Sequence, residues 1–300
     1  MLDQHDGIHD AVVTRLERGH TNESYALATP RGRYVLRRAW AGKPATQIAA
    51  EERVLTALAA HTHPLAFDIP RIIPTRARTP HGLDGDRVVH LFSECRGTPG
   101  PRWLAPGDHE RMHAAMTTLA HLHRALARVA PPGIGRVGGG VGPGFPCHVP
   151  ERSEGHGADE PQWLHGDFHL GNLLWTGETI TSVVDFDDTV RGNPATEAAM
   201  ALFALARQPE ESTFVYDEAL WTTGHDAYVS AGGVPVTGDR DALATRFCAY
   251  QVLVHLAATH RKLWTLDEGI GFWPCLRYLA RNRRTASTVA GRSAPVRDES

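Results

Sequence analysis

Lysine is nearly absent from this chain of 300 residues, which contains two lysines, Lys43 and Lys262, against 29 arginines. Cysteine is also scarce, and its spacing does not match the paired spacings of zinc-binding cysteines. The four cysteines are scattered, at Cys95, Cys147, Cys248 and Cys275. We therefore expect free thiols in a reducing compartment, and neither a disulfide framework nor a cysteine metal site.

Long apolar runs and basic runs are missing as well. No stretch approaches the roughly 18 unbroken apolar residues of a membrane-spanning helix. The first residues, MLDQHDGIHD, are acidic and polar, unlike a signal peptide. The formal net charge is −3, and no basic, aromatic-rich surface is indicated. We expect a cytoplasmic protein without a membrane or nucleic-acid partner; the sequence does not indicate its oligomeric state.

The bulk composition is that of an ordinary globular chain. Hydrophobic residues make up 42% and charged residues 22% of the sequence, close to typical values for folded proteins. This length predicts one or two domains with a sizeable core.

The most informative stretch runs from residue 163 to 188 and reads WLHGDFHLGNLLWTGETITSVVDFDD. Asp167 and Asn172 lie five residues apart in it, and Asp185 follows two valines. In phosphoryl-transfer enzymes, an aspartate at such a place accepts the proton of the attacking hydroxyl, and an asparagine holds a magnesium ion. Asp185 fits a second metal ligand that bridges to the nucleotide phosphates.

The same stretch predicts a hairpin. Residues 173–175 and 181–184 read as short strands, with a turn at residues 176–178. Such a hairpin would carry Asn172 and Asp185 back to the same end.

HGDFHLGNLLW followed by VVDFDD resembles the signature of the aminoglycoside phosphotransferase and choline kinase superfamily. The resemblance implies an α+β, bilobal protein-kinase-like fold, with a small antiparallel-sheet lobe that carries one helix and a mainly helical second lobe. We place the nucleotide-binding lobe at residues 1–95, the catalytic and substrate-binding lobe at 96–284, and a disordered tail at 285–300. IPRIIPT followed by HLFSECRG is most similar to the homoserine-kinase-like or stress-response-kinase-like branch.

Periodicity and turn residues predict the elements of the small lobe. Strands are expected at residues 12–16, 25–28, 34–37, 69–74 and 88–92, a helix at 46–60, and a loop at 79–86. Asn22 and Ser24 lie between the first two strands, where backbone N–H groups and small polar side chains can cover nucleotide phosphates.

Several residues of this lobe are assigned to ATP binding by the resemblance. Val35 and Arg37 share one strand face; the resemblance places Val35 over the adenine and Arg37 on the phosphates, where a kinase usually has lysine. A solvated charge on an edge strand is the alternative for Arg37. Glu51 matches the glutamate that pairs with this cation, with Glu52 as its nearest competitor. The segment at Glu94 and Cys95 would be the hinge that hydrogen-bonds adenine.

The second lobe is predicted to be helical. Helices are expected at residues 108–129, 195–207, 214–231, 240–263 and 272–283. The Gly/Pro-rich segment 131–159 shows no periodicity, so it predicts a lid or a disordered segment. Glu197 stands where the family usually has an aspartate that braces the catalytic loop.

Together these features predict Mg²⁺-dependent phosphorylation of a hydroxyl on a small molecule by ATP. Use of GTP in place of ATP is left open. His165 is expected to bond backbone near Asp185. His169 could contact substrate or solvent, while Asp187 and Asp188 could serve a second metal, a cationic acceptor or a helix cap. A protein Ser/Thr kinase of the stress-response type and a nucleotide-binding regulator without turnover are the alternatives. The acceptor remains open among antibiotics, amino alcohols, homoserine-like compounds and sugars.

Overall fold

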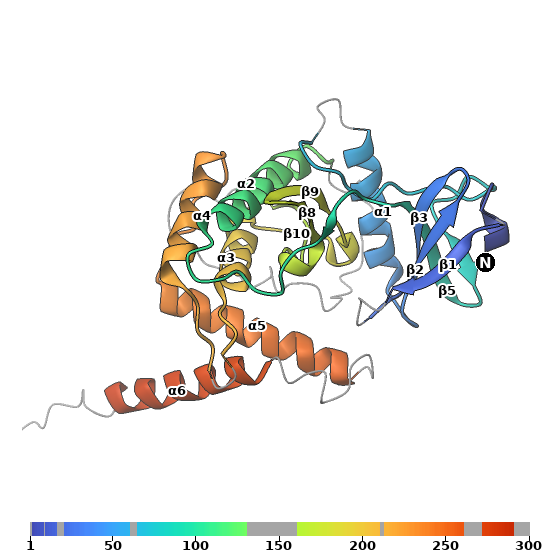
Figure 1. Ribbon diagram of the computed structural model, residues 1–300. Helices are drawn as coiled ribbons and strands as arrows, with labels where there is room; N and C mark the ends of the chain where they lie inside the picture. Colours follow the sequence, from blue (N-terminus) through green and yellow to red (C-terminus); the bar gives the residue numbers. More distant parts are fainter. Residues whose placement is uncertain are drawn as a thin grey trace, which may run out of the picture.

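The fold is bilobal and α+β, as predicted. A computed structural model describes residues 2–8, 10–16, 21–60, 65–130, 161–210, 213–260 and 272–290. An antiparallel sheet forms one end of the molecule, five helices gather at the other, and α1 stands between them (Figure 1). The Gly/Pro-rich segment of residues 131–159 lies outside the described residues.

The N-terminal sheet is five-stranded, with the order β1-β2-β3-β5-β4. Its strands are β1 (Val12–Leu16), β2 (Glu23–Thr29), β3 (Gly32–Arg38), β4 (Gly82–Asp84) and β5 (Arg87–Ser93). Leu27, Leu36 and Leu91 point to one face and pack with Ile8 in a small core. Because side chains alternate along a strand, Arg37 points to the opposite face, toward α1. A short 3₁₀ helix, η1 (Leu2–Gln4), precedes the sheet.

Two predictions for this region were wrong. The segment at residues 69–74 is not a strand; it makes a single bridge, between Ile72 and Phe92. Pro70 and Pro74 explain this, since proline has no backbone N–H to donate to a ladder. The predicted loop at residues 79–86 contains β4, which pairs with β5 from Gly82 to Asp84.

Helix α1 (Ala45–Ala59) buries one apolar stripe formed by Ile48, Val54, Leu55 and Leu58. Spacings of three and four residues place these side chains on one side of the helix. Glu51 is buried on the same helix. The apolar stripe therefore fixes how α1 presents Glu51.

The C-terminal part consists of α2 (His109–Leu126), α3 (Pro194–Ala206), α4 (Glu218–Ser230), α5 (Arg240–His260) and α6 (Trp273–Ala290). Met112, Met116, Leu119 and Leu122 of α2 are fully buried and form the centre of the main core. α6 continues to Ala290, so the disorder predicted from residue 285 is wrong as far as residue 290, and residues 291–300 lie outside the described residues. Within the described ranges, no helix is long and apolar enough to cross a membrane.

Short strands position the catalytic stretch. The predicted hairpin is present as β8 (Leu173–Thr176) and β9 (Thr179–Val183), and β6 (Thr98–Pro99) pairs with β8. A second pair joins β7 (Gln162–Leu164) to β10 (Val190–Gly192). Val184 N–H donates to the Asn172 carbonyl at 2.9 Å. The two ends of the hairpin, at Asn172 and Asp185, therefore lie side by side.

Candidate active site

The loop after β7 is held by a buried carboxylate. Glu197, on α3, accepts the backbone N–H groups of His165 at 3.2 Å and of Gly166 at 2.5 Å. Its Oε2 also lies 2.7 Å from Nε2 of His123, whose Nδ1 lies 2.7 Å from the Tyr228 hydroxyl. Because a carboxylate only accepts, His123 Nε2 carries the proton. The bracing contact predicted for Glu197 is present.

Gly166 is required by the path of this loop. Its φ is 88°, a region that favours glycine, and an added Cβ would overlap the backbone carbonyl oxygen of Asp188. The loop that carries Asp167 thus packs directly against the segment that follows Asp185.

Asp167 and Asn172 are brought together as predicted. Asn172 Nδ2 donates to the Asp167 carbonyl at 2.8 Å and to Asp167 Oδ2 at 3.2 Å. His169 Nδ1 accepts the Gly171 N–H at 3.0 Å, so its Nε2 carries the proton and donates to Asp167 Oδ2 at 3.2 Å. Burial alone would raise the pKa of Asp167, but the electrostatic interaction and the hydrogen bond with His169 hold this pKa below the ordinary value.

His165 makes the backbone contact expected of it. Its ring is fully buried, and Nδ1 accepts the Asp167 N–H at 3.3 Å, so Nε2 carries the proton and donates to the Val184 carbonyl at 3.0 Å. Burial lowers the pKa of His165. A neutral ring therefore links the loop of Asp167 to the residue before Asp185.

Asp185 occupies a left-handed backbone conformation, with φ of 65°, at the start of η3 (Phe186–Asp188). Such a conformation is uncommon for a residue other than glycine and is found at functional sites. Its carboxylate lies 3.4 Å from Arg37 Nη1. Burial and the neighbouring charge of Asp187 raise the pKa of Asp185 to about 6, despite the opposing effect of Arg37.

Arg37 pairs with Glu51, as the resemblance implied. The Arg37 Nη2 to Glu51 Oε2 distance is 2.5 Å, and both side chains are almost completely buried. β3 lies in the middle of the sheet, so the alternative of a solvated charge on an edge strand is wrong. Glu52 does not pair with Arg37; it contacts His81 and His90.

Lys43 is a site residue that the sequence did not single out. It lies in the turn between β3 and α1, its side chain is 2% exposed, and its ammonium contacts Asp187 and lies 3.4 Å from Glu51. Arg37 and Lys43 together, against the cost of burial, lower the pKa of Asp187 to about 2. The scarcity of lysine could have identified this residue. Of the two lysines in the chain, Lys43 lies six residues after Arg37, the cation of β3.

The other residues predicted to bind the nucleotide lie around Arg37, Lys43 and Asp187. Asn22 Oδ1 accepts the Trp40 N–H at 3.2 Å, and its side chain also hydrogen-bonds Asp187. Ser24 lies opposite Arg37 in the β2–β3 register. Val35 lies opposite Phe92, whose ring stacks beneath the Arg37 guanidinium at 4.9 Å. Gln47 Nε2 donates to Asp188 Oδ1 at 3.1 Å.

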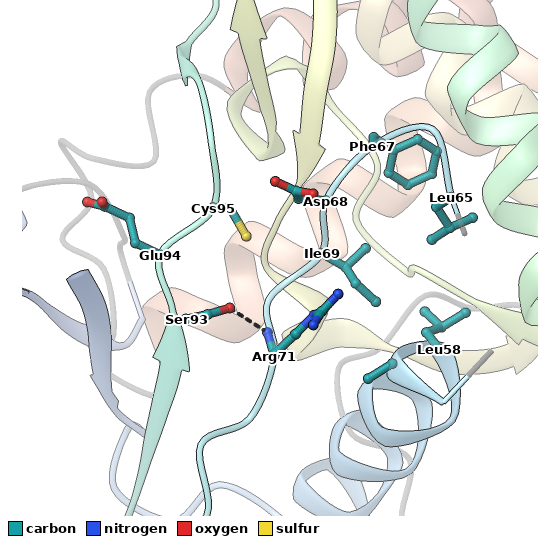
Figure 2. A pocket seen from close by; sticks show the side chains of 10 residues that line it. Leu58, Leu65, Phe67, Asp68, Ile69, Arg71, Ser93, Glu94 and Cys95 are labelled. Carbon is teal, nitrogen blue, oxygen red and sulfur yellow. Dashed lines mark hydrogen bonds between the residues drawn. The ribbon is translucent and has the colours of Figure 1, made fainter. Parts of the chain in front are cut away.

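Glu94 and Cys95 belong to the predicted hinge. They line a pocket of about 430 Å³ shared with the end of α1 and residues 65–71 (Figure 2). In this view the Cys95 sulfur points into the space among the lining residues, whereas the Glu94 carboxylate points away from it and pairs with Arg33 at 2.5 Å. Burial raises the pKa of the Cys95 thiol to about 12.

Carboxylates outnumber cations where the two lobes meet. Arg37 and Lys43 lie near Glu51, Asp185, Asp187 and Asp188, and Asp167 lies near Asp185 and Asp188. Burial, followed by the charges of the neighbouring aspartates, raises the pKa of Asp188 well above its ordinary value. Oxygen ligands with excess negative charge suit Mg²⁺. The donor set therefore fits a divalent cation that would relieve the repulsion among these carboxylates.

Comparisons with known proteins identify the family of the chain. The sequence matches the phosphotransferase enzyme family over residues 12–140 and 146–233. No curated protein matches the chain.

Solved structures share the fold across nearly the whole chain. A microcompartment-associated aminopropanol kinase superposes with a TM-score of 0.69 at 19% identity, covering 96% of each chain. Amicoumacin kinase in complex with AMP-PNP, Ca²⁺ and its ligand superposes with a TM-score of 0.64 at 13% identity, covering 92% of this chain and 88% of the other. A macrolide 2'-phosphotransferase from Brachybacterium faecium gives 0.55 at 20% identity, covering 88% and 91%.

The family match defines the class, a phosphotransferase, and the solved structures share its fold. The chain belongs to the phosphotransferase enzyme family.

Proposed function

We propose that this protein transfers the γ-phosphoryl group of ATP to a hydroxyl of a small molecule. The observation that carries the proposal is the position of Arg37. From β3 it contacts both Glu51 on α1 and Asp185 after β9. One cation thereby joins the groups expected to hold the nucleotide to those expected to hold the metal.

Asp167 is the proposed base. In the described part of the chain, the hydrogen bonds to its carboxylate go to Oδ2, from His169 and Asn172. We therefore assign Oδ1 to the acceptor hydroxyl. The hydroxyl proton passes to Asp167, the hydroxyl oxygen bonds to the γ-phosphorus, and ADP leaves.

Asn172 and Asp185 would hold Mg²⁺. The Asn172 amide nitrogen is occupied by Asp167, so the amide oxygen is the atom available to a cation. When bound, the ion neutralises charge on the phosphates.

The remaining residues bind and orient the nucleotide. Arg37 and Lys43 compensate phosphate charge, with Glu51 and Asp187 fixing where the two cations lie. Asn22, Ser24 and Val35 line the phosphate and adenine side, and backbone groups at Glu94 and Cys95 hold the adenine edge. His169 and Asp188 lie beside Asp167 and face the acceptor. A cytoplasmic location is part of this proposal, in keeping with the free thiols of Cys95, Cys248 and Cys275.

The decisive experiment replaces Asp167 with asparagine. ATP turnover would be measured with a coupled assay against a panel of hydroxyl compounds, and ATP affinity by calorimetry. Because general-base catalysis contributes roughly 100- to 10,000-fold, Asp167→Asn should lose turnover on that scale while ATP affinity is kept. Asp226→Asn, on an exposed part of α4, is the matched control.

Two outcomes would overturn parts of this proposal. Turnover of Asp167→Asn within about tenfold of the wild type would remove Asp167 as the base. ATP binding without turnover of any compound would favour the nucleotide-binding regulator. Labelled ATP added to a lysate tests the protein-kinase alternative, which predicts labelled protein bands.

A further inference from the structure

A cluster outside the proposed active site has the ligands of a transition-metal site. It consists of Glu52 on α1, His81 just before β4, and His90 on β5. Glu52 Oε1 lies 2.5 Å from His81 Nδ1 and 2.9 Å from His90 Nε2. Each residue offers one ligand atom, and the three atoms lie within 4.8 Å of one another. In the described ranges this is the one such group of histidine, cysteine and acidic residues.

The geometry is close to what a tetrahedral ion requires. Zn²⁺ binds imidazole nitrogen and carboxylate oxygen at about 2.0 to 2.2 Å, so neighbouring ligand atoms lie about 3.3 Å apart. The pairs measured here are shorter by less than about 1 Å, so a small outward shift of the Glu52 carboxylate would admit the ion. The ion would replace the two ring protons that now point at Glu52 Oε1.

The ligands are also held in place before any metal binds. The His90 side chain is 1% exposed, and its ring stacks on Phe92 with centroids 5.4 Å apart. Glu52 follows Glu51 on a helix whose apolar stripe is buried. The His81 side chain is 33% exposed, which gives a path of entry and a place for a water ligand.

We propose that Glu52, His81 and His90, with a water as the fourth ligand, form a zinc site that fastens α1 to the N-terminal sheet. Two imidazoles and one carboxylate favour Zn²⁺ over Mg²⁺, which prefers oxygen ligands. His90 lies opposite Arg37 in the β3–β5 register, and Glu52 adjoins Glu51. A bound ion therefore ties α1, which carries Glu51, to β5, the strand that pairs with β3 next to Arg37.

The test measures zinc binding without nucleotide or turnover, so its result is independent of the proposed phosphoryl transfer. Full-length protein, stripped with a chelator, is titrated with Zn²⁺ against a chromophoric competitor. Millimolar Mg²⁺ is kept present to occupy the carboxylates near Asp167. The wild type should bind one more tight equivalent than His81→Asn or Glu52→Gln, and its melting temperature should rise with zinc. His113→Asn, exposed on α2, is the matched control and should behave as wild type.

Circular dichroism of His81→Asn checks that the variant folds, which its partly exposed position favours. Co²⁺ loading of the wild type gives a second readout, because tetrahedral nitrogen and oxygen ligation produces visible absorption bands that His81→Asn should lose. Equal zinc stoichiometry and affinity in the wild type, His81→Asn and Glu52→Gln would overturn the proposal. So would the absence of a tight equivalent in the wild type.

Discussion

At the scale of single residues, Lys43 adds a second buried cation to the one expected at Arg37. A kinase lysine usually lies on the strand that here carries Arg37. Instead, Lys43 enters from the following turn and is buried between Glu51 and Asp187. Two carboxylates are thus shared by two cations, so each cation is fixed by partners from different elements.

Lys43→Ala should lower kcat/KM by about ten- to a hundredfold, because a buried, pre-positioned charge near the phosphates is lost. Lys43→Arg should recover part of the loss, which a purely structural role would not require. Arg38→Ala is the control; Arg38 pairs with Glu23 and Asp84 on the other face of β3. Steady-state kinetics that show equal effects for Lys43→Ala and Arg38→Ala would contradict the assignment.

The raised pKa of Asp185 predicts how metal binding depends on pH. A proton competes with the cation for this carboxylate, whose pKa is about 6 before metal binds. Affinity for Mg²⁺ should therefore fall about tenfold between pH 7 and pH 5. Without metal, the stability of the protein changes with pH in the opposite direction. Folding raises the pKa of the Asp185 carboxyl, so stability is lost as the pH rises from the unfolded-state pKa through about 6.

Thermal unfolding with and without Mg²⁺ checks both parts, and omitting ATP keeps the titration of the nucleotide out of the measurement. The stabilisation by Mg²⁺ should be larger at pH 7 than at pH 5. An equal effect of Mg²⁺ at both pH values would contradict Asp185 as a ligand that titrates near 6.

At the scale of elements, the loop from His165 to Asn172 depends on Gly166. A Cβ at this position would overlap the Asp188 carbonyl, so Gly166→Ala must push the loop of Asp167 away from the segment after Asp185. Misplacement on the order of 1 Å costs about a hundredfold in rate. Gly166→Ala should therefore lose turnover on that scale.

Gly177→Ala is the matched control for this substitution. Gly177 also has a positive φ, of 62°, but an added Cβ there meets nothing within 4 Å. Gly177→Ala should cost about 1 to 2 kcal/mol of stability through backbone strain and leave turnover unchanged. Similar kinetics for the two alanine variants, with both folded, would show that the Asp188 contact has no effect on catalysis.

The sequence predicted elements whose signal is local. The hairpin from Leu173 to Val183 carries its own turn residues, and α2 carries an uninterrupted apolar stripe. The prediction of a strand at residues 69–74 failed because its prolines lack the backbone N–H groups that a strand donates. The grouping of Glu52, His81 and His90 could not be predicted, since it depends on how β4 and β5 pack on α1 and not on spacing along the chain.

At the scale of the whole molecule, a chain of buried hydrogen bonds runs from α4 to the catalytic loop. Tyr228 contacts His123 on α2, His123 contacts Glu197 on α3, and Glu197 accepts the N–H groups of the loop. The helices of the second lobe are thereby connected to the segment before Asp167. A substitution that disturbs the packing of these helices should therefore also change the position of the catalytic loop.

Tyr228→Phe should destabilise the protein by about 1 to 3 kcal/mol, because His123 Nδ1 is left buried without its partner. For a chain of this size, each kcal/mol corresponds to a shift of about 2 °C in Tm. Tyr25→Phe, which removes a half-buried bond to Glu23 at 3.2 Å, is the control. Differential scanning calorimetry with equal Tm values for the two variants would contradict a special role of this network.

The connection between the two lobes is fastened to a single strand. Asp68 exchanges backbone hydrogen bonds with Thr181 and Val183 of β9. Arg96 pairs with Asp68 at 2.6 Å, and its carbonyl accepts the Ser182 hydroxyl. The segments at Asp68 and at Arg96 thus both contact β9, which ends two residues before Asp185. A rotation of the sheet relative to the helices would therefore act on β9, and we expect it to change the position of the Asp185 carboxylate.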